Sequence, residues 1–426
     1  MMENLLKIMK AAPGIDDWRV NLTETRSHEA FFVKRRLETL RATDTASASV
    51  TVFVDHGGYR GDSSFSLTPA MTEEEIGEKL EKARARALLV KNQPYTLPEA
   101  GSLEGVLPDG LSDREPGELL SEIADAVFAA EDGEGATVNA LEIFLYDVSR
   151  RVVTGSGVDK RESKKSVMIE AIPTFTDEEG SVELYHSERF SSFDPADLTK
   201  RIGSRMREVR DRARAEKPAS SFTGKVLLGA EEIRELFWTL ADDLRYDVAY
   251  QHANLHKAGD DLQKDGDGDR LSITLRGRLE GSASSALFDN DGVTLSEVAL
   301  IEDGAVRALY GPDRFGKYLG IARPAGDLPC LAAKPGSLTR KELGKEPYLE
   351  CVSLSGLQVD LYNDYIGGEI RLAYLHEGEK ATPLTGISMS GKLSDALRGM
   401  RLSEKTCLRG SYQGPDGLLL PGMTVI

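Results

Sequence analysis

Polar and apolar side chains alternate along the first part of the chain and then give way to a helical repeat. Residues 18–55 alternate β-branched and aromatic side chains with polar ones in short runs, a pattern typical of antiparallel strands. Thr72 and Glu75 are then spaced as in a capping box, and Ile76 and Leu80 keep helical spacing after them. This order predicts a sheet followed by a capped helix.

The same order of patterns returns further along the chain. Residues 140–192 alternate again, and Asp194 stands where a helix cap is expected before the helical repeat of residues 195–215. A linker rich in Pro and Gly, residues 90–118, separates the two stretches. We interpret the repetition as a duplicated strand–helix unit that builds an antiparallel sheet covered by helices. Shared Arg, Ala and Glu composition can also make the two helix ends look alike.

The composition changes near Pro218, which marks a domain boundary. We predict an N-terminal α+β domain over residues 1–218, with one or more antiparallel sheets, and a β-rich C-terminal domain over residues 219–426. From about residue 270, short strands broken by Gly and Asp follow one another regularly, which indicates a mostly antiparallel, barrel-like domain. The apolar ending, residues 417–426, predicts a buried strand or a subunit interface. The expected fold class is therefore α+β.

Charge and cysteine content narrow the classes of partner. The 53 basic and 70 acidic residues leave a formal charge of -17, which argues against a nucleic-acid-binding surface. Cys330, Cys351 and Cys407 are odd in number and far apart, so neither a disulfide framework nor a zinc ribbon is indicated. No segment approaches the roughly 18 apolar residues of a membrane span. We expect a cytoplasmic protein that contacts neither nucleic acid nor membrane.

Two histidines are the first candidates for a metal site. His252 and His256 stand four residues apart, a spacing that would bring both rings to one face of a helix and allow zinc binding. The segment after them, residues 257–261, favours an end to the helix, and no adjacent Glu is present to act as a base. Surface or cavity-lining imidazoles are therefore the favoured interpretation. A zinc site built from His252, His256 and Cys407 stays open as the alternative.

Several ordered motifs in the second half of the chain resemble a known family. The stretches "LFDNDGVTLSEVALIEDGAVRALYG", "LPCLAAKPGSLTRKEL", "GGEIRLAYLHEGEKATPLTGISMSGKLSDALRGM" and "LLLPGMTVI" resemble the C-terminal domain of the TldD/PmbA family. The resemblance covers about residues 220–426, and residues 1–215 agree through the order of strands and helices. Members of this family were called modulators of DNA gyrase and are now regarded as metallopeptidase subunits.

The resemblance also implies which kind of member this chain is. The TldD type carries H-E-x-x-x-H on the helix that follows the "VLL" strand, and a Cys near the C-terminus adds a zinc ligand. In this sequence Trp238, Thr239 and Asp243 take the places of His, Glu and His, while Cys407 lies about where that Cys stands. This pattern resembles the PmbA type, also called TldE, which lacks the motif. The resemblance therefore implies no catalytic residue and no metal ligand set in this chain, with zinc held by a TldD-type partner.

The family implies a function for the assembly rather than for one chain. A heterodimer with a TldD-type subunit would cleave peptides or unfolded proteins in the cytoplasm, and this subunit would supply cavity walls and substrate selection. A homodimer is the other expected assembly. Two alternatives of another class stay open, namely an independent zinc hydrolase that uses His252, His256 and Cys407, and a protein-binding modulator linked to DNA gyrase. Whether the chain is itself an enzyme is thus left open.

One strand is a candidate for holding substrate. Gly367 and Gly368 would leave room for a close backbone approach, and Ile370 and Leu372 alternate with polar side chains after them. An extended peptide could add to such a strand through backbone hydrogen bonds. We predict a cavity-facing strand here, and the alternative is a core strand with a glycine bulge.

Overall fold

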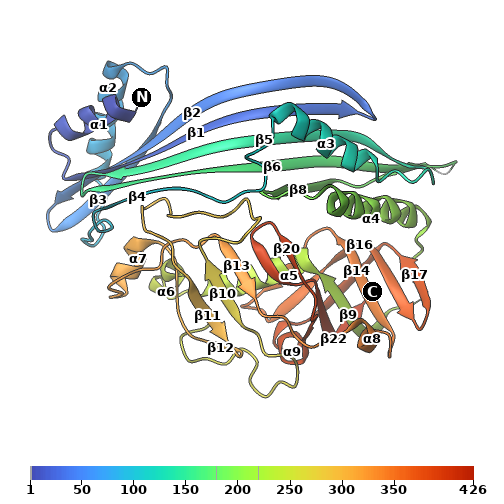
Figure 1. The fold of residues 1–426 in the computed structure, drawn as a ribbon. Coiled ribbons are helices and arrows are strands. Elements are labelled where there is room, and N and C mark those ends of the chain that lie inside the picture. Colours follow the sequence, from blue (N-terminus) through green and yellow to red (C-terminus); the bar gives the residue numbers. More distant parts are fainter. Residues whose placement is uncertain (1, 179, 219) are drawn as a thin grey trace.

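A long sheet lies across a C-terminal β domain in the computed structural model, which describes residues 2–178, 180–218 and 220–426 (Figure 1). The eight-stranded sheet has the order β3-β2-β1-β5-β6-β4, with β7 and β8 also paired to β6. Its strands are antiparallel except for β4, which runs parallel to β6. The strands are β1 (Asp17–Val33), β2 (Arg36–His56), β3 (Tyr59–Leu67), β4 (Gly101–Val106), β5 (Ala136–Thr154), β6 (Val158–Thr176), β7 (Ser181–Glu183) and β8 (His186–Phe190).

Helices cover one face of this sheet. α1 (Met2–Ala11) and α2 (Glu73–Ala87) pack with the end formed by β1, β2 and β3, whereas α3 (Pro116–Phe128) and α4 (Pro195–Arg214) pack on β5 and β6. The predicted caps are confirmed, since Thr72 and Glu75 form a capping box and Asp194 accepts N–H bonds from the first turn of α4. Both strand–helix stretches thus contribute to a single sheet. Their origin by duplication stays a prediction.

The C-terminal half contains a closed barrel, which confirms the predicted antiparallel, barrel-like domain. Strand β14 pairs with β9, β9 with β22, β22 with β18, β18 with β16, and β16 returns to β14. The apolar ending of the chain is the buried strand β22 between β9 and β18. The barrel and its attached strands are β9 (Phe222–Gly229), β14 (Tyr348–Leu354), β15 (Gln358–Asp360), β16 (Tyr365–Glu377), β17 (Lys380–Leu384), β18 (Ile387–Lys392), β19 (Arg401–Leu402) and β22 (Gly417–Val425).

A six-stranded sheet stands beside the barrel in the order β12-β11-β10-β13-β21-β20. Within the described ranges, no helix is long and apolar enough to cross a membrane. The predicted division at residues 218 and 219 stays a prediction, and Ala219 lies outside the described residues. The remaining elements are β10 (Ile273–Arg276), β11 (Val298–Glu302), β12 (Ala305–Val306), β13 (Cys330–Ala333), β20 (Thr406–Arg409), β21 (Tyr412–Pro415), α5 (Ala230–Asp243), α6 (Tyr246–Tyr250), α7 (Asp313–Tyr318), α8 (Arg340–Leu343) and α9 (Leu393–Gly399).

Alternate side chains of β6 fasten the sheet to the C-terminal half. The Lys160 ammonium donates to the Gly292 carbonyl at 2.5 Å, and the Lys164 ammonium donates to the Ala283 carbonyl at 2.8 Å. Between them, the Glu162 carboxylate accepts the Leu287 N–H at 2.7 Å. Because neighbours two apart on a strand share a face, all three side chains leave the sheet on one side, opposite the helices.

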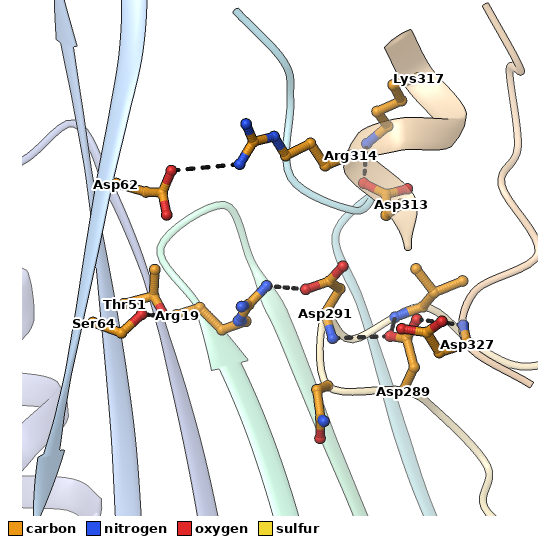
Figure 2. A network of polar contacts seen from close by, with 12 residues as sticks. Arg19, Thr51, Asp62, Ser64, Asp289, Asp291, Asp313, Arg314, Lys317 and Asp327 are labelled. Atoms are coloured by element: carbon orange, nitrogen blue, oxygen red, sulfur yellow. Dashed lines mark hydrogen bonds and ion pairs between the residues drawn. The ribbon is translucent and has the colours of Figure 1, made fainter. Parts of the chain in front are cut away.

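A second set of polar contacts joins the other end of the sheet to the same half (Figure 2). Arg19 of β1 reaches Asp291 in the turn that follows Asp289. The guanidinium of Arg314 in α7 lies 3.6 Å from the carboxylate of Asp62 in β3. These pairs cross between residues more than two hundred positions apart, so they fix how the sheet sits on the C-terminal half.

We predict that Glu162→Ala weakens the docking of the sheet. The Glu162 side chain is only 1% exposed, and its carboxylate lies 2.7 Å from the guanidinium of the largely buried Arg150. The substitution therefore removes the partner of Arg150 and also the acceptor of the Leu287 N–H. Breaking a buried ion pair from one side costs about 3–5 kcal/mol. Chemical denaturation should show a loss of this size.

Glu78→Ala is the matched control, because its carboxylate is 63% exposed and pairs with Lys82 on the surface of α2. Such exposed pairs contribute about 0–1 kcal/mol. Equal losses in the two variants would mean that the Glu162 contact does not hold the halves together.

Candidate functional site

A groove of about 840 Å³ runs between the sheet and the C-terminal half. Strand β8 and helix α4 form one wall, and the start of α5 with the edge strand β20 forms the other. Its lining is strongly charged with both signs. The charged lining residues are Glu188, Arg189, Asp194, Asp197, Lys200, Arg201, Glu231, Arg234, Glu280, Lys405 and Arg409.

An ion-pair network orders the wall formed by β8 and α4. The Arg201 guanidinium donates to Glu188 at 2.9 Å and also contacts Asp197 one helical turn away. His186 lies 3.5 Å from the other oxygen of Glu188. Burial alone would raise the pKa of Glu188, but the nearby His186 ring and the charge of Arg201 outweigh it and lower the pKa to about 2.

The sequence did not point to this wall. Glu188 and Arg201 belong to separate elements of the N-terminal half, so no short motif contains both. The available signals were the spacing of Asp197 and Arg201, which suits an ion pair on a helix, and the alternation along β8. Neither signal says that the residues face another half of the molecule.

Helix α5 holds the three residues that stand at the family's motif positions. The Trp238 indole N–H donates to the Ser411 hydroxyl at 3.2 Å, and the Thr239 hydroxyl donates to the Glu235 carbonyl at 2.9 Å. Asp243 is buried at the end of the helix, where it accepts the N–H of Leu255 at 2.7 Å. All three side chains are thus engaged in contacts within the chain.

The two histidines do not share a helix. α6 ends at Tyr250, and His252 has a φ of 57°, which is left-handed and breaks the helical path. The alternative in which both rings share one helix face is therefore wrong, and the chain leaves the helix before His252, as the sequence favoured. Instead, the Nδ1 atom of His256 lies 2.9 Å from a carboxylate oxygen of Asp243 and ties the following loop to the end of α5.

Cys407 lies far from this pair. It lines the groove together with Glu231, at the first turn of α5, whereas His256 contacts Asp243 at the last residue of that helix. At 1.5 Å of rise per residue, the two ends are about 18 Å apart. Burial raises the pKa of the Cys407 thiol, which keeps it protonated near neutral pH. His256 and Cys407 therefore cannot share one metal ion in this structure.

A group of carboxylates near the turn at Asp289 resembles a cation site at first sight. Burial and then the nearby charge of Asp291 raise the pKa of Asp289 to about 7. Asp289 accepts N–H bonds from Asp291 and Val293, each at 2.9 Å, and from Asp327 at 3.1 Å (Figure 2). The other carboxylates are paired with cations, namely Asp291 with Arg19, Asp313 with Lys317, Asp327 with Arg245 and Asp62 with Arg314.

These carboxylates form a structural network rather than a metal cradle, because their oxygens are already satisfied by partners within the chain. Across residues 2–178, 180–218 and 220–426, no three His, Cys, Asp or Glu side chains are placed to hold a metal ion. The residues present therefore do not fit the zinc site that the resemblance assigns to TldD-type proteins.

The predicted substrate strand is β16, and it lies within the barrel wall. Ile370 and Leu372 are buried, and Ile370 belongs to the barrel core. Gly367 is opposite Gln358 of β15 on one side and Ser390 of β18 on the other, while Gly368 is opposite Met389. These contacts favour the core alternative, and the substrate role of the strand stays a prediction.

Comparisons with known proteins give a family match for the C-terminal half and fold matches for the whole chain. Residues 222–426 match the model of the PmbA/TldA metallopeptidase C-terminal domain. No curated protein matches the chain in sequence.

Solved structures with the same fold cover nearly the entire chain. A provisionally assigned modulator of DNA gyrase from Thermotoga maritima has a TM-score of 0.81 at 15% identity, with 100% of both chains covered. TldE from Thermococcus kodakarensis has a TM-score of 0.80 at 15% identity, covering 100% of this chain and 99% of that one. Another provisionally assigned gyrase modulator, from Bacteroides thetaiotaomicron, reaches 0.80 at 16% identity, covering 99% and 97%. At such identities the likeness shows the fold alone.

We predict that Glu188 makes the groove wall sensitive to acid. Its pKa falls from 4.5 in the unfolded chain to about 2 in the folded one, so its contribution to stability is complete above pH 4.5. That contribution is lost as the pH falls from 4.5 towards 2. Melting temperatures measured across this interval should fall less steeply in Glu188→Gln than in the unmodified protein, whereas Glu118→Gln, an exposed position on α3, should keep the original slope. Parallel profiles for all three proteins would contradict this role.

We expect Gly368→Val to destabilise the barrel. A Cβ atom at Gly368 would lie 2.7 Å from the carbonyl oxygen of Gly356, and the backbone there cannot move aside cheaply. Overpacking of this kind costs about 1–3 kcal/mol or more, which thermal unfolding would detect. Gly101→Val is the control, because nothing lies within 4 Å of its added Cβ. A Gly368→Val protein of unchanged stability whose complex cleaves peptides poorly would instead support the substrate role.

Proposed function

Because this chain belongs to the TldD/PmbA family through its C-terminal domain, we propose that it is the PmbA/TldE-type subunit of a two-subunit metallopeptidase. The complex would act on peptides or unfolded proteins in the cytoplasm. Zinc would be held by a TldD-type subunit, where it would polarise the scissile carbonyl and activate water. This chain would contribute binding surface and no reacting group.

The contacts of α5 carry this proposal. Hydrolysis by a metal site of this type needs an imidazole pair and a carboxylate base on one helix. At the matching positions, the indole of Trp238 and the hydroxyl of Thr239 are neither ligand nor base, and Asp243 is bonded to the loop that contains His256. Recruiting Asp243 to a metal would release that loop from the helix.

The groove offers a way to hold a peptide without regard to its sequence. In the described part of the chain, β20 pairs only with β21, so its other edge is free along the groove. An extended peptide can add to such an edge by backbone hydrogen bonds. The charges of both signs around it, such as Lys200 on one wall and Glu280 on the other, suit a polar chain better than an apolar ligand.

We predict that the purified chain carries well under one zinc per molecule and does not cleave peptides by itself. Mixing it with the TldD-type subunit of its own host should produce peptide cleavage that neither subunit shows alone. Zinc analysis by mass spectrometry and a fluorogenic peptide assay would measure both.

The double substitution His252→Ala with His256→Ala is the control for the competing function. It should leave the zinc content and the reconstituted cleavage unchanged, because these residues hold no metal in the proposed role. Stoichiometric zinc in the chain alone, lost on this substitution, would identify an independent hydrolase and overturn the proposal.

A further inference from the structure

A small cavity lies under the start of α3, apart from the groove. Its volume is about 220 Å³. Leu111, Leu119 and Leu145 line it, and all three belong to the apolar core between α3 and the sheet, on the face that the helices cover (Figure 1). Drug-sized ligands need about 300–1,000 Å³, so this cavity suits a smaller molecule. At about 30 Å³ for each water, the space corresponds to roughly seven waters, the size of a metabolite with fewer than about ten non-hydrogen atoms.

Charged side chains stand in one row across the floor of this cavity. Arg26 of β1 is directly opposite Asp147 of β5, and Asp147 is directly opposite Lys165 of β6. Directly opposed residues share a face of the sheet. Leu145, two positions before Asp147, shares that face and is buried in the core beneath α3. The row therefore faces the helices, and Lys165 points away from its neighbour Lys164, which bonds to the C-terminal half.

The two arginines that line the cavity already have partners. Arg26 pairs with Asp44 at 3.4 Å. Arg114 pairs with Glu122 of α3, and its guanidinium carbon also lies 5.8 Å from the centre of the Phe193 ring. Both cations are thus balanced by carboxylates within the chain, so neither charge is left over for a ligand.

Two further charges stand side by side without being paired. In the residues that the structure describes, the side chains of Asp147 and Lys165 make no hydrogen bond and no ion pair. Opposite charges directly across a strand pair normally attract each other, so a carboxylate and an ammonium that stay apart here are available to a third group. One free anion, one free cation and an apolar wall thus meet around a space for a small molecule.

We propose that this cavity binds a free α-amino acid with an apolar side chain. The ammonium group of the ligand donates to Asp147, its carboxylate accepts from Lys165, and its side chain lies against Leu119 and Leu145. Opposed residues on neighbouring strands are about 4.5–5.5 Å apart, a separation that one amino acid can span with its two charges. A peptide sets its terminal charges at least one residue further apart, which adds about 3.3 Å. The inference does not depend on the proposed function.

Analogues of leucine test which groups of the ligand are recognised. Titration calorimetry should show that L-leucine binds the purified chain in the millimolar range or more tightly. 4-Methylpentanoate lacks the ammonium group and leucinamide lacks the carboxylate, so each should bind about tenfold more weakly or worse, the loss expected for a charge-assisted hydrogen bond. Affinity should rise from alanine through valine to leucine, by about fourfold for each carbon that is buried.

Asp147→Asn and Lys165→Met test the two charges of the cavity. Each should weaken leucine binding about tenfold or more, because each removes one partner of the zwitterion. Asp147→Asn should not weaken the binding of 4-methylpentanoate, since that analogue has no ammonium group to lose. Asp395→Asn and Lys82→Met are the matched controls, at side chains that are 66% and 70% exposed, and both should bind leucine like the parent chain. Melting curves without ligand should show that all variants are folded.

The same measurements can overturn the proposal. An absence of leucine binding at millimolar concentrations would do so, and so would full affinity for leucine in both Asp147→Asn and Lys165→Met. 4-Methylpentanoate that binds as tightly as leucine would identify a site for apolar carboxylates instead, and dileucine that binds more tightly than leucine would identify a site for peptide ends. None of these measurements uses a TldD-type subunit or peptide cleavage, so their outcome is separate from that of the proposed function.

Discussion

The groove depends on three side chains of β6 that bond to the main chain of the C-terminal half. Lys160, Glu162 and Lys164 each reach backbone groups within residues 283–292. A buried charge without its partner costs several kcal/mol. A docked position that breaks one of these bonds is therefore less stable by about that amount than the position that keeps all three. These bonds therefore favour one docked position of the sheet on the C-terminal half. In that position β8 and α4 lie opposite α5 and β20.

The sheet can serve both halves because a strand exposes alternate side chains to opposite faces. On β6, Val167 and Ile169 face the helices and are fully buried among apolar groups. Lys160 and Glu162 leave the other face and are buried as well, but against backbone polar groups. In the sequence, the alternation of polar and apolar residues along β6 is typical of a strand with one face in water. In the structure both faces are buried, and the partners of the polar face come from distant parts of the chain, so the local pattern could not show it.

Local signals predicted the elements well and the site poorly, for a physical reason. The capping box at Thr72 and the cap at Asp194 depend on residues within one turn, so the sequence contains all that forms them. The spacing of His252 and His256 left a shared helix face open as an alternative, because spacing alone does not state where a helix stops, and the chain turns left-handed at His252. Glu188 and the edge of β20 meet across the groove only after the two halves dock.

The outer side of β2 and the strand that docks on the C-terminal half lie apart for a reason of topology. The order β3-β2-β1-β5-β6 places β2 and β6 at opposite sides of the sheet, with β1 and β5 between them. β6 bonds to the C-terminal half and so positions the paired strand β8 beside the groove, whereas no strand of the described ranges lies beside residues 36–47 of β2 on the side away from β1. Neighbouring strands are about 4.8 Å apart, so the free edge is three strand spacings, roughly 14 Å, from the strand that carries the docking contacts. Because β8 pairs with β6, the groove wall and the outer side of β2 lie at opposite ends of the strand order.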